Sequence, residues 1–318
     1  MYKEKTIPVY IKNIEEVTKY VKRFTLASIE GKQLPRFSGG SHISTYLETA
    51  KGLLVRTYSL TSHPDVTSHY QIAVRLNDQS KGGSLYWHNN IKAGDKIQIS
   101  YPKNQFPLSF KAKHHVFYAA GIGITPFLSM MKELKDKGSS FELHYASKNL
   151  EFCAFYEDLN KHYPHQCRCY FSNQNKRIQT RSLENHHVGT HVYFCGPEAF
   201  INEFTSAAYR VGFHESAVHF ERFHPPQPKN AAPFQVQLKD GTLIQVKKDE
   251  TLLQALQNQG IEAPYSCQAG RCGTCELSVK EGEIDHYDSF LSEEQRNAQD
   301  RILTCVSRGK SSKLVIEI

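Results

Sequence analysis

Residues 265–277 read YSCQAGRCGTCEL, and they place three cysteines within nine residues. A fourth cysteine lies far downstream, in the stretch ILTCVS. The resulting pattern is Cys267-x4-Cys272-x2-Cys275, followed by twenty-nine residues and then Cys305. The opening stretch MYKEKTIPVYIK lacks the apolar core of a signal peptide, so we expect reduced thiols in a cytoplasmic protein. Clustered, reduced cysteines indicate metal binding or catalysis rather than a disulfide framework.

This spacing is that of a plant-type [2Fe–2S] ligand set. Four thiolates have to converge on two iron atoms, so three come from one tight loop and one from a distant strand. Gly270 and Gly273 allow that loop to wrap closely, with backbone N–H groups turned toward the sulfurs. A zinc site is the alternative, but zinc sites favour two separated C-x2-C pairs. The sequence therefore predicts an iron–sulfur cluster in the last part of the chain.

The other cysteines and the histidines show no second metal motif. Cys153, Cys167 and Cys169 fall at an expected helix start and in an expected strand, and we interpret them as buried free thiols. The sixteen histidines include adjacent pairs at residues 114–115 and 186–187, whose members cannot share one face of a strand. The sequence thus predicts one metal centre, made of cysteines.

The composition is that of a soluble globular protein with more than one domain. The chain has 318 residues, of which 39% are hydrophobic and 22% are charged. Its most apolar stretch, HHVFYAAGIGITPFLSMM, is short and interrupted by glycine, threonine and proline, so we expect no membrane span. The net charge is +10 over residues 1–232 and −3 over residues 233–318, which favours separate modules. The basic residues form no stripe, so we expect no nucleic-acid partner.

The first hundred residues read as short strands. Each strand alternates or is rich in β-branched and aromatic residues, and turn residues such as Pro64 and Gly94 separate them. Many short strands at this spacing predict a closed antiparallel β-barrel. The expected strands cover residues 6–17, 21–29, 41–48, 53–62, 70–77 and 95–102.

The pattern changes near residue 110 to alternating strands and helices. HHVFYAAG is a continuous apolar run suited to a strand buried on both faces, and Pro126 and Gly138 bound the helix that follows. Strands alternating with helices predict a doubly wound α/β domain around a parallel sheet. Further strands are expected at residues 141–147, 167–172 and 191–196, and further helices at residues 154–163 and 197–212.

A third change comes at FHPPQPKNAAP, where four prolines among small and polar residues predict a stiff linker. Beyond it, we expect a hairpin around Asp240–Gly241 and a helix with a capping box of Thr251 and Gln254. The predicted organisation is a barrel over residues 1–108, an α/β domain over 109–224, a linker over 225–232 and an α+β domain over 233–318.

Two stretches resemble known families. Residues 233–318 resemble a plant-type ferredoxin, through YSCQAGRCGTCELSVKEGEI and LTC. RTYSLTS resembles the R-x-Y-S-L motif of the ferredoxin–NADP reductase superfamily, in which it lies on a barrel strand against the flavin. The resemblance implies that Arg56 neutralises the flavin phosphate, that Tyr58 packs on the isoalloxazine, and that Ser59 acts in catalysis by hydrogen-bonding near N5. It also assigns the following residues to the flavin site: Thr57, Ala73, Val74, Arg75, Lys81, Gly82, Gly83 and Ser84.

The loop AAGIGITP resembles the nucleotide-binding loop of the same superfamily. Gly121 and Gly123 would let a pyrophosphate approach the backbone, and Thr125 would lie between nucleotide and flavin. The stretch CGP ends the last expected strand of the sheet, and the resemblance places Cys195 and Gly196 beside the nicotinamide, with Cys195 in a catalytic role. A buried strand cysteine is the alternative interpretation of Cys195.

The order of flavin barrel, nucleotide domain and ferredoxin resembles that of the phthalate dioxygenase reductase family. Members of this family are reductase components of Rieske-type oxygenases. PKNQFPL, GIGITPFLSM and HFERF carry this likeness, which covers essentially the whole chain. It implies FMN as the flavin, NADH as the electron donor, an oxygenase component as the partner and a monomer when the protein is free. Phe223 would be a third catalytic residue, covering the nicotinamide face of the flavin, and a linker anchor is its alternative role.

Several alternatives stay open. Ser147, Lys148 and Arg177 are placed where they could bind a 2′-phosphate, so NADPH is an alternative to NADH. Carnitine, vanillate and phthalate systems are the candidate oxygenases, and a stand-alone ferredoxin-type reductase for another acceptor is the alternative function. A self-contained monooxygenase is disfavoured because no residues are left for a substrate-oxidising domain. Intact RTYSL, GIGITP and CGP motifs disfavour a simple electron carrier.

Overall fold

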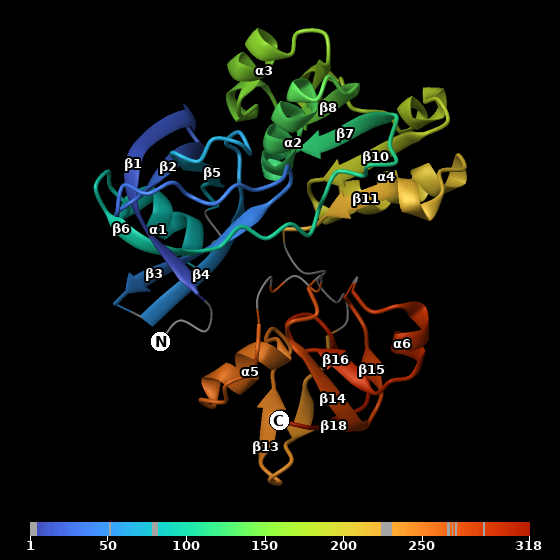
Figure 1. Ribbon diagram of the computed structural model, residues 1–318. Helices are drawn as coiled ribbons and strands as arrows, with labels where there is room; N and C mark the ends of the chain where they lie inside the picture. The colour runs from blue at the N-terminus through green and yellow to red at the C-terminus, as the bar shows by residue number, and fades with distance from the viewer. Residues whose placement is uncertain are drawn as a thin grey trace. The chain divides into compact units, whose positions relative to one another are not determined.

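The computed structural model describes residues 5–50, 52–77, 82–223, 231–265, 268, 270, 272–288 and 290–318. The chain separates into two compact units, Met1–Glu221 and Arg222–Ile318, and each is described by itself (Figure 1). None of the helices in the described part of the chain is long and apolar enough to cross a membrane. The predicted linker falls mostly on residues 224–230, which lie outside the described residues.

The first part of the first unit is an antiparallel barrel, as the alternating strands predict. Its six-stranded sheet has the order β4-β3-β6-β1-β2-β5. A bridge between Leu60, just after β4, and Ile72 of β5 joins the two edge strands and closes the sheet. The elements are β1 (Thr6–Thr18), β2 (Val21–Ser28), β3 (His42–Thr49), β4 (Gly52–Ser59), β5 (Tyr70–Arg75), α1 (Gly83–Asn89) and β6 (Lys96–Ser100).

The tryptophan of α1 is the centre of the barrel core. Trp87 is fully buried, and its ring meets Phe24 of β2 edge-on at a centroid distance of 4.7 Å. The ring of Tyr58 on β4 lies 5.6 Å away, again edge-on. This packing fixes α1 against the strand that carries the predicted flavin motif, and aromatic pairs of this kind add to the stability gained by burial.

The second part of the first unit is the predicted doubly wound α/β domain. Its five strands are all parallel, in the order β11-β10-β7-β8-β9. The last strand, β11, was not predicted from the sequence. The main elements are β7 (His114–Ala120), η1 (Gly121–Ile124), α2 (Thr125–Asp136), β8 (Phe141–Ser147), α3 (Tyr156–His162), β9 (Cys167–Phe171), η4 (Thr180–Asn185), β10 (Thr190–Cys195), α4 (Glu198–Arg210) and β11 (Val218–Glu221).

Helices cover both faces of this sheet. On one face, the ring of Phe127 from α2 stacks on Phe117 of β7 at 4.8 Å. On the other face, Phe204 of α4 packs on Tyr118 of β7 at 5.3 Å. Neighbouring residues of β7 therefore point into opposite cores, which explains why its sequence is apolar throughout.

The second unit is a mixed sheet with two short helices. The sheet has the order β13-β12-β18-β14-β16, in which β12 and β18 are parallel and the other pairs are antiparallel. The predicted hairpin at Asp240–Gly241 and the predicted capping box at Thr251 are both confirmed. The elements are β12 (Phe234–Gln237), β13 (Leu243–Val246), α5 (Leu252–Asn258), β14 (Glu276–Glu281), β15 (Ile284–Asp285), α6 (Glu293–Asn297), β16 (Arg301–Leu303), β17 (Arg308–Gly309) and β18 (Lys313–Ile316).

Candidate functional site

The predicted flavin motif lies on β4, where it alternates between the two faces of the strand. Arg56 and Tyr58 point to one side, and Thr57 and Ser59 point to the other. The strand is held by its neighbour β3, because Thr45 Oγ1 donates to the Arg56 carbonyl at 3.0 Å. Burial raises the pKa of Tyr58, so its hydroxyl stays protonated and its ring acts as an apolar surface.

Arg56 lies directly over the start of α1. A Cβ on Gly83 would stand 2.6 Å from Arg56 Nε, so a side chain at this position would displace the guanidinium from where it lies. Gly82 has a left-handed φ of +96°, and Ser84 Oγ accepts the backbone N–H of Asn77 at 3.1 Å. The structure therefore brings together Arg56, Gly82, Gly83 and Ser84, whereas Lys81 lies outside the described residues. A guanidinium beside an open glycine backbone suits a phosphate.

The predicted residues of β5 connect the barrel to the nucleotide loop. Ala73 and Val74 are buried in the strand, and the Val74 carbonyl lies 2.9 Å from His88 Nε2. Arg75 is exposed, and its Nη1 lies 3.4 Å from the position that a Cβ on Gly121 would take. Arg75 thus extends from the barrel to the first glycine of the loop AAGIGITP.

Two glycine loops pack against each other at the carboxyl edge of the parallel sheet. A Cβ on Gly123 would stand 2.3 Å from the Cys195 carbonyl oxygen, and one on Gly196 would stand 2.9 Å from the Ala120 Cβ. The loops after β7 and β10 therefore touch backbone to backbone, at the edge where open α/β sheets bind ligands. Cys195 is fully buried. Its position beside a nicotinamide stays a prediction.

The hydroxyl of Thr125 forms a hydrogen bond within its own loop. Thr125 Oγ1 donates to the carbonyl of Ile122 at 3.0 Å, and the residue is 3% exposed. The structure places Thr125 at the first position of α2, directly after η1. It therefore fixes the conformation of the nucleotide loop, and its contact with a nucleotide stays a prediction.

Three of the four predicted cluster cysteines belong to the described residues. Cys275 precedes β14 and Cys305 follows β16, and their sulfurs lie 3.2 Å apart. The neighbouring Cys305 thiol lowers the pKa of Cys275. Two thiolates that share one tetrahedral metal with bonds of about 2.3 Å lie about 4 Å apart, so this pair suits one iron of a cluster. Cys272, three residues before Cys275, is half-buried. Cys267 lies outside the described residues.

The glycines of the cysteine loop are needed for close contacts. Gly270 and Gly273 have φ values of +71° and +70°. A Cβ on Gly270 would stand 2.7 Å from Val306 Cγ2, and one on Gly273 would stand 2.3 Å from the ring of Phe290. The backbone angles of both glycines, and the lack of space beside the Asp288 backbone at Gly270, support the prediction that they let the loop wrap closely.

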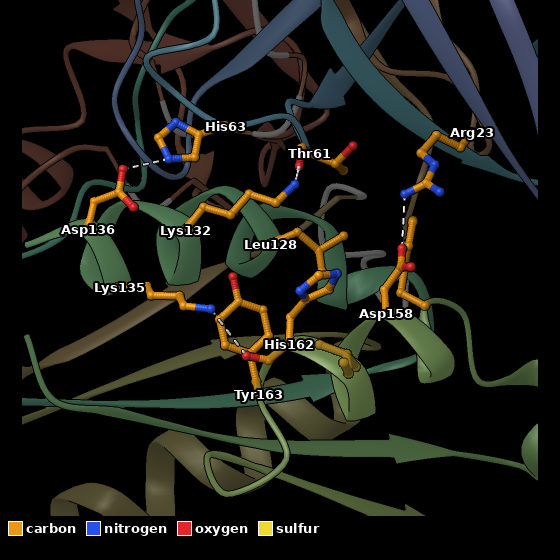
Figure 2. A pocket seen from close by; sticks show the side chains of 12 residues that line it. Arg23, Thr61, His63, Leu128, Lys132, Lys135, Asp136, Asp158, His162 and Tyr163 are labelled. Carbon is orange, nitrogen blue, oxygen red and sulfur yellow. Dashed lines mark hydrogen bonds and ion pairs between the residues drawn. The ribbon is translucent and has the colours of Figure 1, made fainter. Parts of the chain in front are cut away.

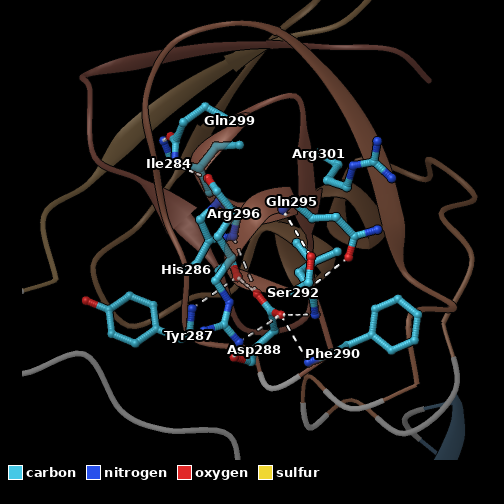
Figure 3. A network of polar contacts seen from close by, with 12 residues as sticks. Ile284, His286, Tyr287, Asp288, Phe290, Ser292, Gln295, Arg296, Gln299 and Arg301 are labelled. Atoms are coloured by element: carbon cyan, nitrogen blue, oxygen red, sulfur yellow. Dashed lines mark hydrogen bonds and ion pairs between the residues drawn. The ribbon is translucent and has the colours of Figure 1, made fainter.

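A buried carboxylate that the sequence did not point to, Asp288, fixes the segment that packs against this loop, and Figure 3 shows its hydrogen bonds. Asp288 Oδ2 accepts the backbone N–H groups of Phe290 and Leu291 at 3.1 and 2.8 Å. Arg296 donates to the Asp288 carbonyl at 2.7 Å, and the Asp288 side chain is completely buried. Asp288 therefore holds Phe290 in place against Gly273. The sequence around Asp288 does not mark this role, because an aspartate bonded to the backbone two and three residues on is common in turns.

Comparison with known proteins identifies all three parts of the chain. Residues 8–107 match a model described as an oxidoreductase FAD-binding domain, and residues 236–310 match one described as a 2Fe-2S iron-sulfur cluster binding domain. Residues 98–218 match the dimethylamine monooxygenase subunit DmmA-like N-terminal domain. The chain is 41% identical to the carnitine monooxygenase reductase subunit of Escherichia coli (strain K12), over 98% of both chains.

This chain belongs to the phthalate dioxygenase reductase family. The solved structure of phthalate dioxygenase reductase itself matches with a TM-score of 0.79 and 30% identity over 98% of both chains. The heme-dependent oxidative N-demethylase beta subunit of Ectopseudomonas mendocina (strain ymp) is 36% identical over 98% of this chain and 99% of its own. As a member of this family, the protein is an NAD(P)H-dependent oxidoreductase that carries a flavin and a [2Fe–2S] cluster. The predictions of an iron–sulfur cluster over a zinc site and of a flavin barrel are confirmed.

A pocket of about 450 Å³ lies between the barrel and helices α2 and α3 (Figure 2). Among the described residues that line it, none belongs to the predicted flavin or nucleotide set. Burial lowers the pKa of Lys132, on its wall, to about 8. Three polar contacts cross it: Lys132 Nζ to the Thr61 carbonyl at 2.6 Å, His63 to Asp136 at 2.7 Å and Arg23 to Asp158 at 3.0 Å. The first two hold the segment after the flavin strand against α2, which begins at the nucleotide loop, and the third joins β2 to α3.

Phe223 is a half-buried residue of the second unit. The flavin motif belongs to the first unit. The role of Phe223 over the flavin therefore stays a prediction from the family resemblance.

Substitution of Gly123 by alanine tests the contact between the two nucleotide loops. The added methyl meets the Cys195 carbonyl, so we expect the loops to separate and nucleotide-dependent flavin reduction to slow by about fivefold to a hundredfold, equivalent to about 1–3 kcal/mol. The measurement is stopped-flow bleaching of the flavin by NADH. The visible absorbance of the cluster, in the other unit, should be unchanged. Wild-type bleaching rates in Gly123→Ala would contradict this account.

Substitution of Asp288 by alanine tests the support of the cluster loop. The buried N–H of Leu291 and the partly buried N–H of Phe290 would lose their acceptor, at a cost of about 1–3 kcal/mol, so the cluster should be lost at a lower temperature. The measurement is the thermal loss of cluster absorbance. Glu293→Ala, at an exposed position of α6, is the matched control and should behave as wild type. Equal midpoints for Asp288→Ala and Glu293→Ala would show that Asp288 does not support the loop.

Proposed function

We propose that this protein is the reductase component of a two-component oxygenase, that it uses NADH and FMN, and that its acceptor is a Rieske-type oxygenase of the carnitine class. The observation that carries the proposal is the 41% identity, over 98% of both chains, to a carnitine monooxygenase reductase subunit. We call the group of Arg56, Tyr58 and Gly83 the flavin corner. Its geometry, together with that of the nucleotide loops and the cysteine loop, supports a complete electron-transfer chain within one polypeptide.

The residues have separate tasks in this chain. Arg56 beside Gly83 binds the flavin phosphate, and Ser59 supplies a polar group near the reacting edge of the ring. Gly121 and Gly123 keep the loop open for the dinucleotide pyrophosphate. When bound, a flavin accepts a hydride and gives up single electrons, which is what a one-electron [2Fe–2S] acceptor requires.

Contacts near the carboxyl ends of β8 and β9 favour NADH over NADPH. Ser147 Oγ donates to the Asn149 carbonyl at 3.1 Å, and Lys148 Nζ lies 5.6 Å from the centre of the Phe152 ring. Two of the three candidate groups for a 2′-phosphate are thus already engaged within the protein. Arg177 is exposed. An arginine without these two neighbours is a weaker phosphate site, because strong sites combine several donors.

The identity of the flavin is tested by extraction. The barrel matches a model named for FAD, whereas the full-length likeness to phthalate dioxygenase reductase supports FMN. We expect heat or acid to release a flavin whose mass is that of FMN. Release of an adenylate-bearing flavin in mass spectrometry would overturn the assignment.

Replacement of one cluster ligand tests the order of electron transfer. Cys272→Ser should lose the cluster and stop reduction of a carnitine-type Rieske oxygenase component. NADH oxidation by ferricyanide should continue, because the flavin corner lies in the other unit. Cys167→Ser, which changes a half-buried cysteine outside the cluster loop, is the matched control and should retain both activities. Loss of flavin reduction in a folded, flavin-loaded Cys272→Ser protein would contradict the modular account.

Reduction of the acceptor protein by NADH also distinguishes a second candidate acceptor from the Rieske-type oxygenase. The 36% identity to a heme-dependent oxidative N-demethylase beta subunit favours a haem-containing partner as the alternative. Under anaerobic conditions with NADH, wild-type protein should reduce the Rieske component and leave the haem component oxidised. Reduction of the haem component alone would favour this second candidate.

A further inference from the structure

The pocket between the barrel and helices α2 and α3 has no task in the electron-transfer chain described above. Its volume of about 450 Å³ is that of a pocket for a small molecule. All the residues that line it belong to the first unit, and they come from β2, from the segment after β4, from α2 and from the region of α3. The chemistry of these residues therefore indicates what the pocket could bind.

Part of the lining is apolar. Four buried residues make up this part, which we call the apolar lining: Leu128, Phe155, Leu159 and Tyr163. Phe155 has a left-handed φ of +65°, an unfavourable backbone conformation for an aromatic residue. Its ring is also covered by the guanidinium of Arg23, whose central carbon lies 5.6 Å from the ring centre. The apolar lining suits the apolar part of a ligand.

Four of the charged or titratable lining residues are already paired with one another. His63 Nε2 lies 2.7 Å from an oxygen of Asp136, and Arg23 Nη1 lies 3.0 Å from an oxygen of Asp158. A second carboxylate, that of Glu15, lies 2.6 Å from Arg23 Nη2. These pairs satisfy their own charges, so they do not call for a ligand.

Lys132 differs from them, because its partner is neutral. Its Nζ donates to the carbonyl of Thr61 at 2.6 Å, and among the described residues no carboxylate forms an ion pair with it. An ammonium group has three donors, so two remain beyond this bond. The side chain is half-buried, and burial together with the nearby Arg23 cation lowers the pKa of Lys132 to about 8. A positive charge withdrawn from water is costly without an anion beside it.

Lys135 adds a second positive charge to the lining. It lies three residues after Lys132 on α2, and its Nζ is 3.4 Å from the carbonyl of His162 and 5.2 Å from the centre of the Tyr163 ring. Neither contact is with a carboxylate. Figure 2 shows both lysine side chains extending from the same helix toward residues of the other elements. The lining holds three cations and two carboxylates, so it is net positive when its histidines are neutral.

We propose that this pocket binds a small organic carboxylate, with its anionic group on Lys132 and its apolar body against the apolar lining. A carboxylate can accept both remaining donors of the ammonium group. A phosphate is less suited, because strong phosphate sites combine several donors. A neutral apolar molecule would leave the ammonium group without an anion. The proposal does not depend on which oxygenase receives the electrons.

A ligand at Lys132 would lie at a contact between the two parts of the first unit. Thr61, which Lys132 contacts, comes two residues after the end of the flavin strand β4, and α2 begins at the nucleotide loop. A carboxylate bound to Lys132 would therefore strengthen the packing of this segment against α2. We expect such a ligand to raise the temperature at which the flavin is released.

Titration of the full-length, flavin- and cluster-loaded protein with benzoate tests the proposal. With binding followed by ligand-observed NMR, we expect a dissociation constant of about 1 mM or lower at pH 7. Benzamide, a neutral analogue of similar shape, should bind about tenfold more weakly or worse. Affinity for benzoate should also fall about tenfold or more in Lys132→Met. Lys137→Met, which changes an exposed lysine just after α2 and outside the pocket lining, is the matched control and should bind as wild type.

The pH dependence of benzoate binding gives a readout that needs no variant. Only the protonated amine attracts a carboxylate, and with a pKa of about 8 its protonated fraction falls about tenfold between pH 7 and pH 9. We therefore expect the affinity to fall about tenfold over this range, whereas a surface lysine of ordinary pKa would keep it nearly constant. The other titratable groups that line the pocket are Arg23 of β2, His63 after β4, Lys135 and Asp136 of α2, and Asp158 and His162 of α3.

Several results would overturn the proposal. They are no benzoate binding by the wild type, equal binding of benzamide, and an affinity that stays constant from pH 7 to pH 9. Equal affinities in Lys132→Met and Lys137→Met would overturn it as well. Displacement of benzoate by NAD⁺ would place the carboxylate at the nucleotide site and would equally contradict the proposal. We expect saturating NAD⁺ to leave benzoate binding unchanged, and benzoate to delay thermal flavin release in the wild type and in Lys137→Met but not in Lys132→Met.

Discussion

Close approach of a neighbouring group to a bare glycine backbone is the constraint on which the redox sites depend. At each of three positions a Cβ would stand less than 3 Å from the group packed against it. The nucleotide loop therefore requires a glycine at Gly123, whose neighbour is backbone, and the cysteine loop favours one at Gly273, where φ is +70°. A side chain at Gly83 would displace the guanidinium of Arg56. The contacts are Gly83 with Arg56, Gly123 with the Cys195 carbonyl, and Gly273 with Phe290.

Much of this could be predicted from the sequence, because the signals are local. Alternation gives the barrel strands, and the glycine loops and cysteine spacing mark their sites directly. β11 was missed because its four residues carry too little periodicity to stand out. Asp288 was missed for a different reason. Its bonds to the backbone two and three residues on are common in turns, and only tertiary packing places it beside Gly270 of the cysteine loop.

The redox residues of the α/β domain gather at one end of its sheet. The nucleotide loops lie at the carboxyl ends of β7 and β10, where the chain leaves the sheet and backbone groups are open to a ligand. Glycines at this end let the two loops approach each other backbone to backbone.

Electron paramagnetic resonance during anaerobic NADH titration tests the central claim most directly. We expect NADH to deliver two electrons together to the flavin, and the cluster in the cysteine loop to receive them one at a time. We therefore predict that, after mixing with one equivalent of NADH, the flavin absorbance bleaches first. Samples frozen at later times should then show the paramagnetic signal of a reduced [2Fe–2S] cluster. A cluster that stays oxidised after complete flavin reduction, in protein with full iron content, would contradict the account.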